Sequence, residues 1–369
     1  MTPFAHTNTR LVAVVLFLAM RGALAVDGDL PRRTNAMPER YENATLELSS
    51  VRDARGERLR TLTTVPRVEG RLPAIFVAGW LSCDSVEIPA SGGDGVARLL
   101  RQLVTDTGAI VARVDKPGVG DSEGNCAETD FDTELSGYRT AFRALRAHPR
   151  ADPTRIVLLG ISNGGGFSPL IAEGAPVAGF VSIGGWSKTW FEHMIELERR
   201  RLALQGRPRA AISSEMKLLS ELYAGYLLER RTPAEVIQLK PTLESVWYDE
   251  PSHQYGRPAT YYHQLQALDL GAAWSKVAMP ALIVWGEYDW IMSREDQTMI
   301  VDSINANAPG RARLLTVPRM DHGFSTHAAP KAAFDRMGGG DYPQGAAAEI
   351  VAFIRATVSA RGAESSKAR

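Results

Sequence analysis

The segment Ile156-Val-Leu-Leu-Gly160-Ile-Ser162-Asn-Gly164-Gly-Gly166 joins a short apolar run to a glycine-rich turn. The apolar run predicts a buried strand, and the apolar residues after the glycines predict a helix. Between a strand and a helix, a Gly-x-Ser-x-Gly turn holds its serine in a strained backbone conformation, with the hydroxyl projecting from the sheet. Gly160 and Gly164 avoid the collisions that side chains would cause there. Ser162 is therefore a candidate nucleophile, whereas an inert serine in a turn is the alternative.

The overall composition is that of a globular protein. The chain has 369 residues, of which 44% are hydrophobic and 23% charged. This length is enough for one large domain or two small ones with a substantial core. Lysine plus arginine and aspartate plus glutamate each number 42. The net charge therefore provides no argument for a nucleic-acid partner.

Residues 1–25 have the pattern of a secretory signal peptide. Arg10 precedes the apolar stretch Leu11–Met20, and Ala23-Leu-Ala25 supplies a small-x-small cleavage site. The apolar stretch is too short to span a bilayer, although Arg21 leaves an uncleaved anchor open. We expect a mature chain without stable membrane insertion that works outside the cytoplasm, secreted or in the periplasm of a bacterium.

The rest of the chain predicts an α/β fold. After a flexible lead-in at 26–40, alternating residues over 41–66 predict an antiparallel hairpin. Apolar strands then alternate with helices, which predicts a mostly parallel central sheet flanked by helices. Residues 41–186 and 278–358 would form this core, and 359–369 a frayed polar tail. The predicted strands are 73–78, 109–114, 155–159, 177–183, 281–285 and 313–317, and the predicted helices are 94–105, 131–147 and 343–358.

One long segment, 187–277, interrupts the alternation of strands and helices. It contains no strand of the buried kind and predicts three helices, at 190–204, 211–230 and 259–274. A helical insertion of this size between two strands is typical of a cap over a site. Its tryptophans and tyrosines would either line an apolar pocket or form the core of the cap itself; both interpretations stay open. The residues concerned are Trp190, Trp247, Tyr248, Tyr255, Tyr261 and Tyr262.

An acid and a histidine follow Ser162 at the positions that nucleophilic catalysis requires. A serine hydroxyl needs a base to take its proton, and the base needs a carboxylate to orient it. Asp289 follows the strand 281–285, and His322 follows the strand 313–317. The order serine, aspartate, histidine is the one that the nucleophile-elbow fold uses.

Other residues near these positions are weaker candidates. His327 lies a few residues beyond His322 and is the nearest rival histidine. Glu287 lies too close to the end of its strand to serve as the acid. Asp321 adjoins His322, and we expect its side chain to point elsewhere. We therefore assign the base to His322 and the acid to Asp289.

Two further pairs of residues complete the predicted site. The oxyanion of an acyl-transfer reaction needs two backbone donors. We expect these to be the N–H groups of Asn163 and Trp80. The N–H group of Leu81 is the alternative to that of Trp80. Cys83 and Cys126 are the two cysteines, and in an exported protein an even count suggests a disulfide. The alternative is two unpaired thiols.

Taken together, these motifs resemble the α/β-hydrolase family. The elbow at Ser162, the acid loop Gly286-Glu-Tyr-Asp289 and the loop Asp321-His322-Gly-Phe324 each match the family pattern. The segment Asp115-Lys-Pro-Gly-Val-Gly-Asp-Ser122 is similar to the family's Asp-x-x-Gly-x-Gly-x-Ser turn. One departure is Ala78-Gly79, where many members have His-Gly. Haloalkane dehalogenases resemble this fold but carry aspartate at the position of Ser162, so the serine argues against that class of enzyme.

The resemblance implies a serine hydrolase of carboxylic esters that works through an acyl-enzyme. A peptidase or amidase, or an acyltransferase, would use the same triad. A non-catalytic binding protein would be expected to have a broken triad, and here all three positions are filled. The sequence contains no pattern for a metal or an organic cofactor, so we expect neither, and the expected partner is a small-molecule ester.

Overall fold

The computed structural model describes most of the chain from Asp27 onward. The described residues are 27–33, 37–89, 92–172 and 174–367. The predicted signal peptide at 1–25 lies outside them. Within these ranges, no helix combines the length and the apolar character that a membrane span requires.

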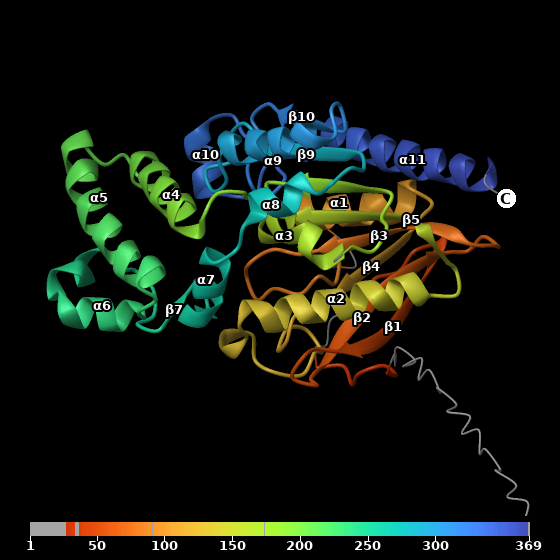
Figure 1. The fold of residues 1–369 in the computed structure, drawn as a ribbon, viewed down its shortest axis with the longest axis horizontal. Coiled ribbons are helices and arrows are strands. Elements are labelled where there is room, and N and C mark those ends of the chain that lie inside the picture. Colours follow the sequence, from red (N-terminus) through yellow and green to blue (C-terminus); the bar gives the residue numbers. More distant parts are fainter. Residues whose placement is uncertain (1–26, 34–36, 90–91, 173, 368–369) are drawn as a thin grey trace, which may run out of the picture.

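An eight-stranded sheet lies at the centre of the molecule (Figure 1). The spatial order of its strands is β1-β2-β4-β3-β5-β6-β9-β10. β1 and β2 form the predicted hairpin, β2 pairs antiparallel with β4, and the other neighbours are parallel. The prediction of a mostly parallel sheet is thus confirmed. The strands are β1 Ala44–Arg52, β2 Arg58–Pro66, β3 Leu72–Ala78, β4 Ile110–Val114, β5 Ala151–Ile161, β6 Gly179–Ile183, β9 Ala281–Gly286 and β10 Ala312–Val317.

Helices cover both faces of this sheet, as the continuous apolar strands predict. Successive residues of β3 enter different cores, with Phe76 on one face and Ile75 and Val77 on the other. The core that includes Phe76 contains residues of α2, α3, α8 and α9, whereas the core that includes Ile75 and Val77 contains residues of α1 and α11. These helices are α1 Gly95–Asp106, α2 Phe131–Ala147, α3 Asn163–Ala172, α8 Leu270–Ser275, α9 Arg294–Asn307 and α11 Gln344–Lys367.

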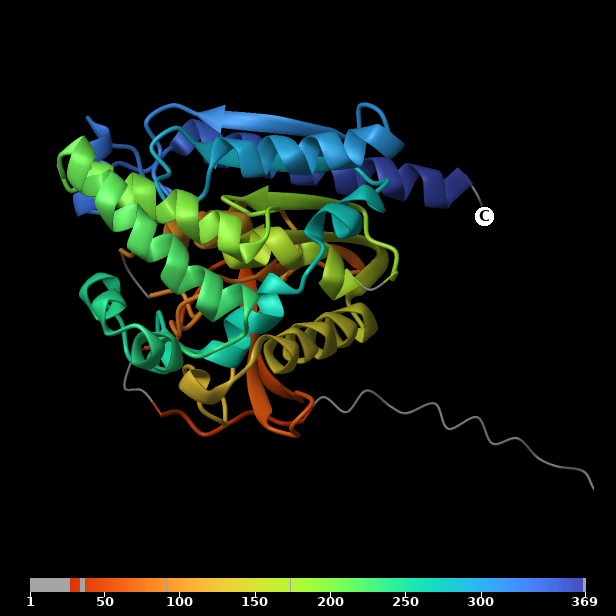
Figure 2. The ribbon, with the colours of Figure 1, turned by 60° about the vertical axis from the view of Figure 1, so that its left-hand side comes forward.

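The predicted cap lies between β6 and β9 and projects beyond one end of the sheet (Figures 1 and 2). Its first helix, α4, has the predicted bounds. Its second predicted helix ends earlier, because α5 passes into a π-helical turn at Ala224–Leu228. The cap also has elements that we did not predict: α6, a 3-10 turn and the short hairpin β7–β8. The bounds are α4 Trp190–Leu204, α5 Arg209–Tyr223, α6 Pro233–Leu239, β7 His253–Gln254, β8 Arg257–Pro258 and α7 Ala259–Gln266.

The third predicted cap helix, 259–274, is wrong as a single element. The chain forms two helices there, α7 and α8, because Asp269 interrupts the first and caps the second by accepting a hydrogen bond from Ala272 N–H. Trp274 of α8 packs on Phe180 of β6, with ring centroids 5.6 Å apart, and donates to the carbonyl of Gly166. α8 therefore belongs to the layer that covers the sheet, although it lies within the predicted cap boundaries.

The lead-in at 26–40, which we expected to be flexible, contributes two buried side chains to the fold. Leu30 and Glu39 are both buried. Glu39 forms an ion pair with Arg113 of β4 at 2.9 Å, and neither side chain is exposed. Charged residues in this segment suggested solvation, but tertiary packing converts them into buried partners, as is required when a charge leaves water.

The expected frayed tail also differs from the structure. α11 continues past Val358 and ends at Lys367. Its apolar residues Ala347, Ile350 and Ile354 are buried against the sheet. Once that packed portion has formed, the helix can extend readily, because each further residue that becomes ordered adds one backbone hydrogen bond.

Candidate active site

Ser162 occupies the turn between β5 and α3 in a left-handed conformation, with φ of +56°. A side chain on Gly160 would approach the carbonyl oxygen of Gly164 to 2.2 Å, and one on Gly164 would approach that of Gly79 to 2.4 Å. Both glycines are therefore required by close backbone approach. The strained serine between them has the geometry of a nucleophile elbow.

His322 and Asp289 meet Ser162 in one hydrogen-bonded chain. His322 Nε2 lies 2.8 Å from Ser162 Oγ, and His322 Nδ1 lies 2.8 Å from Asp289 Oδ2. Asp289 follows β9 and His322 follows β10, so parallel neighbouring strands bring their loops to one edge of the sheet. The other oxygen of Asp289 accepts hydrogen bonds from the N–H groups of Ile291 and Met292. The structure thus brings together the three residues that the sequence singled out.

The surroundings of His322 favour the charged form of its imidazole. Burial by itself lowers the pKa of His322, but attraction to Asp289 and the hydrogen bond that the imidazole donates to its carboxylate outweigh burial and raise that pKa above its usual value. A base with a raised pKa holds a proton more firmly. His322 is therefore suited to accept the proton of Ser162.

Asp321 and His327, the weaker candidates, form a separate buried pair. His327 Nε2 lies 2.7 Å from Asp321 Oδ2. Asp321 also accepts hydrogen bonds from the N–H groups of Ser325 and Gly338. Its carboxylate points into this loop, so it supports the loop that carries His322. The sequence contains both residues but no signal that they pair.

The predicted oxyanion donors lie side by side in the fold. Gly164 N–H donates to the carbonyl of Gly79 at 2.9 Å, which holds the loop after β3 against the start of α3. Asn163 is the first residue of α3, where helical N–H groups have no partner within the helix. Its side chain is engaged elsewhere, donating to Tyr261 Oη and accepting from Trp186 Nε1, each at 2.8 Å. Trp80 and Asn163 both line the cavity at Ser162.

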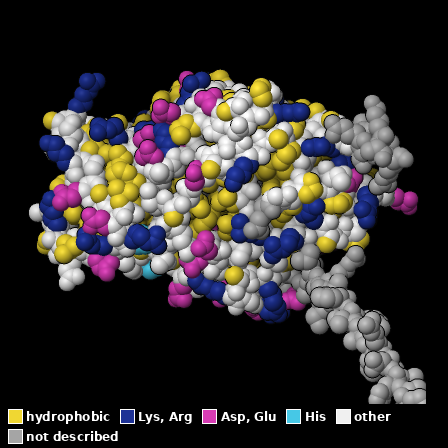
Figure 3. Space-filling model, viewed as in Figure 1, with side chains coloured by type: hydrophobic (Ala, Val, Ile, Leu, Met, Phe, Trp, Pro, Cys, Tyr) yellow, Lys and Arg dark blue, Asp and Glu magenta, His cyan; other side chains and the backbone are white. Residues whose placement is uncertain are grey.

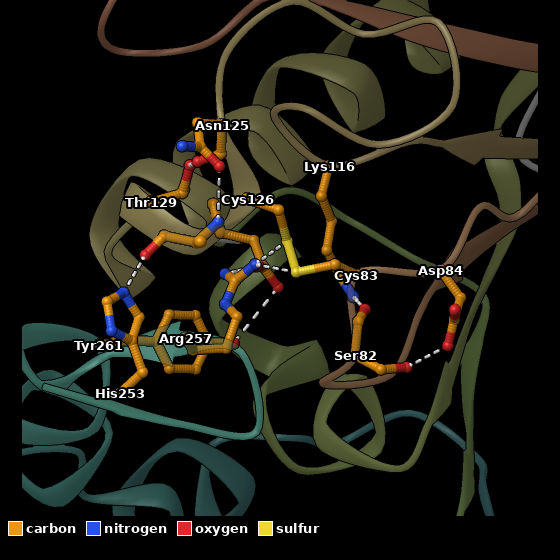
Figure 4. Close-up of a disulfide and its surroundings, with 12 residues drawn as sticks. Ser82, Cys83, Asp84, Lys116, Asn125, Cys126, Thr129, His253, Arg257 and Tyr261 are labelled. Atoms are coloured by element: carbon orange, nitrogen blue, oxygen red, sulfur yellow. Dashed lines mark hydrogen bonds and ion pairs between the residues drawn. A yellow bond between two sulfur atoms is a disulfide. The ribbon is translucent and has the colours of Figure 1, made fainter. Parts of the chain in front are cut away.

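Cys83 and Cys126 form a disulfide, with their Cα atoms 6.0 Å apart (Figure 4). Cys83 lies in the loop after β3, and Cys126 opens the short 3-10 turn Cys126–Glu128. The bond joins the loop that carries Trp80 to the segment after β4. Arg257 of β8, in the cap, donates a hydrogen bond to Cys126 Sγ.

A cavity of about 590 Å³ opens at Ser162 and His322. Core and cap both contribute to its walls, and the lining is mainly apolar. From the cap come Trp190, His193, Leu197 and Tyr255, of which only the two aromatic residues were among the predicted candidates. From the core come the segment 84–89 and the start of α1, among others. No sequence pattern singled out His193, because a lone histidine on a helix is usually structural.

His193 differs from His322 although both line the cavity. It is buried, and burial lowers its pKa to about 4. Its Nδ1 is buried and has no hydrogen-bond partner among the described residues. His193 is therefore neutral near pH 7, and no described carboxylate is placed to orient it as a base.

The described residues contain no group of three or more histidine, cysteine, aspartate or glutamate side chains placed to hold a metal ion. On the face shown in Figure 3, acidic and basic side chains are interspersed and do not form a patch of one sign. The wall of the cavity at Ser162 also carries polar side chains outside the Ser162–His322–Asp289 triad, among them Asp84, Glu87 and Asp94.

Comparison with known proteins agrees with this geometry. A family profile described as "Alpha/beta hydrolase family" matches residues 74–336. No curated protein matches the chain at a significant level.

Among solved structures, Est1E from Butyrivibrio proteoclasticus is similar at 14% identity, with a TM-score of 0.53 over 86% of this chain and 100% of that one. Carboxyl esterase 2 from Tuber melanosporum is similar at 16% identity, with a TM-score of 0.51 over 87% and 90%. A hypothetical protein from Pseudomonas aeruginosa is similar at 16% identity, with a TM-score of 0.51 over 85% and 98%. The profile match covers most of the chain, and the chain therefore belongs to the alpha/beta hydrolase family.

Proposed function

We propose that this chain is an exported serine hydrolase that cleaves carboxylic esters. The observation that supports this most directly is the hydrogen-bonded chain Ser162–His322–Asp289, which opens on a largely apolar cavity. In a family whose fold serves many reactions, function has to be argued from such a site. Apolar walls favour an uncharged ester over a charged substrate.

In the proposed reaction, Ser162 Oγ attacks the acyl carbon while His322 Nε2 takes the hydroxyl proton. The carbonyl oxygen becomes an oxyanion, which the N–H groups of Trp80 and Asn163 stabilise. His322 then protonates the leaving alcohol, and the acyl group stays on Ser162. Asp289 orients the imidazole and stabilises its charged form.

The acyl-enzyme is released by reversal of these roles. His322 takes a proton from water, the hydroxide attacks the acyl carbon, and a second oxyanion forms in the same hole. Collapse of this intermediate returns the proton to Ser162 Oγ and frees the acid. In an acyltransferase a second alcohol would replace the water, so the two activities share every protein group.

Export is the remaining part of the proposal. It rests on the signal pattern at residues 1–25, and a Cys83–Cys126 disulfide fits the oxidising surroundings that export implies. Comparing the amino terminus of the mature protein with the predicted start near Val26 tests this part.

The catalytic part is tested with 4-nitrophenyl esters of increasing acyl length beside aminoacyl 4-nitroanilides. Wild type, Ser162→Ala and the control Ser214→Ala, which changes an exposed helix serine in the cap, are compared. We expect ester turnover in wild type and Ser214→Ala and none above background in Ser162→Ala. Ester turnover that survives Ser162→Ala contradicts the mechanism. Faster anilide than ester turnover assigns a peptidase, and ester products formed with added alcohol assign an acyltransferase.

A further inference from the structure

Residues 79–83, here called the oxyanion loop, are anchored at almost every peptide group. Gly79 N–H donates to Tyr138 Oη at 3.1 Å, and the Gly79 carbonyl accepts from Gly164 N–H at 2.9 Å. The buried Lys116 Nζ donates to the carbonyls of Trp80 and Ser82. The disulfide at Cys83 then closes the far end of the loop.

These anchors determine where the Trp80 N–H points. A trans peptide group is planar, so holding its carbonyl also sets the direction of its N–H. The peptide group before Trp80 is held through the Gly79 carbonyl by α3, and the group after it is held through the Trp80 carbonyl by Lys116. Both planes that meet at the Cα atom of Trp80 are therefore fixed.

Lys116 is unusual because it is a buried lysine without an ion pair among the described residues. It is 5% exposed, and no described carboxylate forms an ion pair with it. A buried cation is costly, so a lysine retained here has to be balanced by its hydrogen bonds. Those bonds go to the oxyanion loop. Figure 4 shows the lysine side chain extending to this backbone beside the disulfide.

The second oxyanion donor is held by the same buried region. Asn163 donates through its side chain to Tyr261 of the cap. Tyr261 Oη lies 3.4 Å from Glu134 Oε1. Glu134 also forms an ion pair with Arg257, and both of these side chains are buried. Arg257 in turn contacts the sulfurs of the disulfide (Figure 4). A continuous set of contacts thus joins the side chain of Asn163 to the disulfide at the end of the oxyanion loop.

We propose that Lys116 is a positioning residue of the ester hydrolysis, because its ammonium group fixes the oxyanion loop so that Trp80 N–H and Asn163 N–H converge on one oxygen. The role of Lys116 rests on the proposed function. It differs from that of Ser162 or His322, since Lys116 touches no reacting atom.

The test compares Lys116→Met, which removes the donors and keeps a long side chain, with Lys116→Arg, which restores a cation with several donors. Lys331→Met, a change to an exposed helix lysine, is the matched control. We expect Lys116→Met to lower kcat about 100-fold with KM changed less than about threefold, since small displacements of a catalytic group cost about this much. Lys116→Arg should recover part of the loss, and Lys331→Met should match wild type.

Two readouts separate positioning from a merely structural role. An alkylboronic acid binds Ser162 as a tetrahedral anion, so its inhibition constant should rise in parallel with the fall in kcat. Rates are expressed per active site counted by burst titration, which removes any misfolded fraction. Unchanged kcat per titrated site, or unchanged boronate affinity, in Lys116→Met overturns the proposal.

The pH profile is the third readout. Burial lowers the pKa of Lys116 to about 8, in spite of attraction to Glu134, Asp84 and Asp115, and repulsion by Arg257 adds to the effect of burial. In wild type, kcat should therefore decline modestly above about pH 8, because the neutral amine keeps two N–H donors but loses the charge that strengthens its hydrogen bonds. Lys116→Arg should lack this decline, because arginine stays protonated. An alkaline decline that persists in Lys116→Arg counts against Lys116.

Failure of the two proposals can be told apart. If wild type shows no ester turnover, or if Ser162→Ala retains it, the proposed function is wrong. If wild type is active and Ser162→Ala is inactive while Lys116→Met keeps its kcat, the function stands and the role of Lys116 is wrong.

Reduction of the disulfide offers an independent check, because it releases the other end of the same loop and should also lower kcat with little change in KM.

Discussion

Two aspartate–histidine pairs have their histidines in the loop after β10, and only one of the pairs contacts Ser162. His322 and Asp289 are 2.8 Å apart, and His327 and Asp321 are 2.7 Å apart. The His322 side chain is 9% exposed and its second ring nitrogen meets Ser162, whereas the His327 side chain is 1% exposed and lines no part of the cavity. We propose that the same pair of residue types serves chemistry in one case and structure in the other, according to whether the second ring nitrogen reaches a nucleophile.

The largest expected contrast comes from removing each histidine in turn. His322→Ala should lower kcat by about 10⁴- to 10⁶-fold, as losses of the base in serine hydrolases do. His327→Ala should leave kcat per folded molecule within about threefold of wild type, since this side chain touches no reacting group. Steady-state kinetics with active-site titration provides the measurement. Similar losses of kcat per titrated site in both variants would erase the distinction.

Removing the charge of each aspartate sharpens the same comparison. Asp289→Asn should lower kcat about 10⁴-fold, because an amide favours the wrong tautomer of His322. Asp321→Asn keeps the size of the side chain and should have a small effect on kcat. If Asp321→Asn were as inactive as Asp289→Asn once corrected for folded protein, Asp321 would have to be assigned a catalytic role.

Stability should show the reverse order. Asp321→Ala leaves His327 and the N–H groups of Ser325 and Gly338 without their buried acceptor. Loss of one partner from a buried network costs about 3 kcal/mol. Urea unfolding of Asp321→Ala, with the exposed substitution Asp335→Ala as control, measures this free energy. A loss below about 1 kcal/mol would indicate that the pair contributes little to the fold.

The pH dependence of kcat should report only one of the two histidines. Asp289 raises the pKa of His322 above its usual value, so the base is protonated and inactive over a wider acidic range. Below that pKa, kcat should fall about tenfold per pH unit, with half-maximal activity above pH 6.5. His327→Ala should leave this acidic limb in place. Displacement of the limb in His327→Ala would show that the two pairs are coupled.

The smallest effect is expected at His193, the cavity histidine that has no aspartate. Burial keeps this side chain neutral, with a pKa of about 4, so it should not act as a base at neutral pH. His193→Leu should change KM by about two- to fivefold through altered packing of the pocket wall and leave the acidic limb in place. Kinetics across a series of acyl lengths measures this change. A loss of kcat comparable to that of His322→Ala would assign His193 to the reaction.

Prediction from sequence succeeded where local pattern is strong. The strand, turn and helix around Ser162, the hairpin at 41–66 and helix α2 are present as predicted. The helix predicted at 259–274 was wrong, and the buried ion pair of Glu39 was not predicted, because a helical period does not reveal a break at Asp269 and a charged residue does not reveal its buried partner. Contacts of the cap with the site were also beyond prediction.

Periodicity and backbone strain act over a few residues, so the order of elements and the requirement for glycine around Ser162 follow from the sequence. Which side chains meet depends on tertiary packing. His322 and Ser162 are separated by 160 positions, and Asn163 and Tyr261 by 98. Lys116 reaches the oxyanion loop 36 positions away from Trp80. Such contacts depend on how strands and cap pack together, because burial alone turns a lysine or an aspartate from a solvated charge into a group with fixed partners.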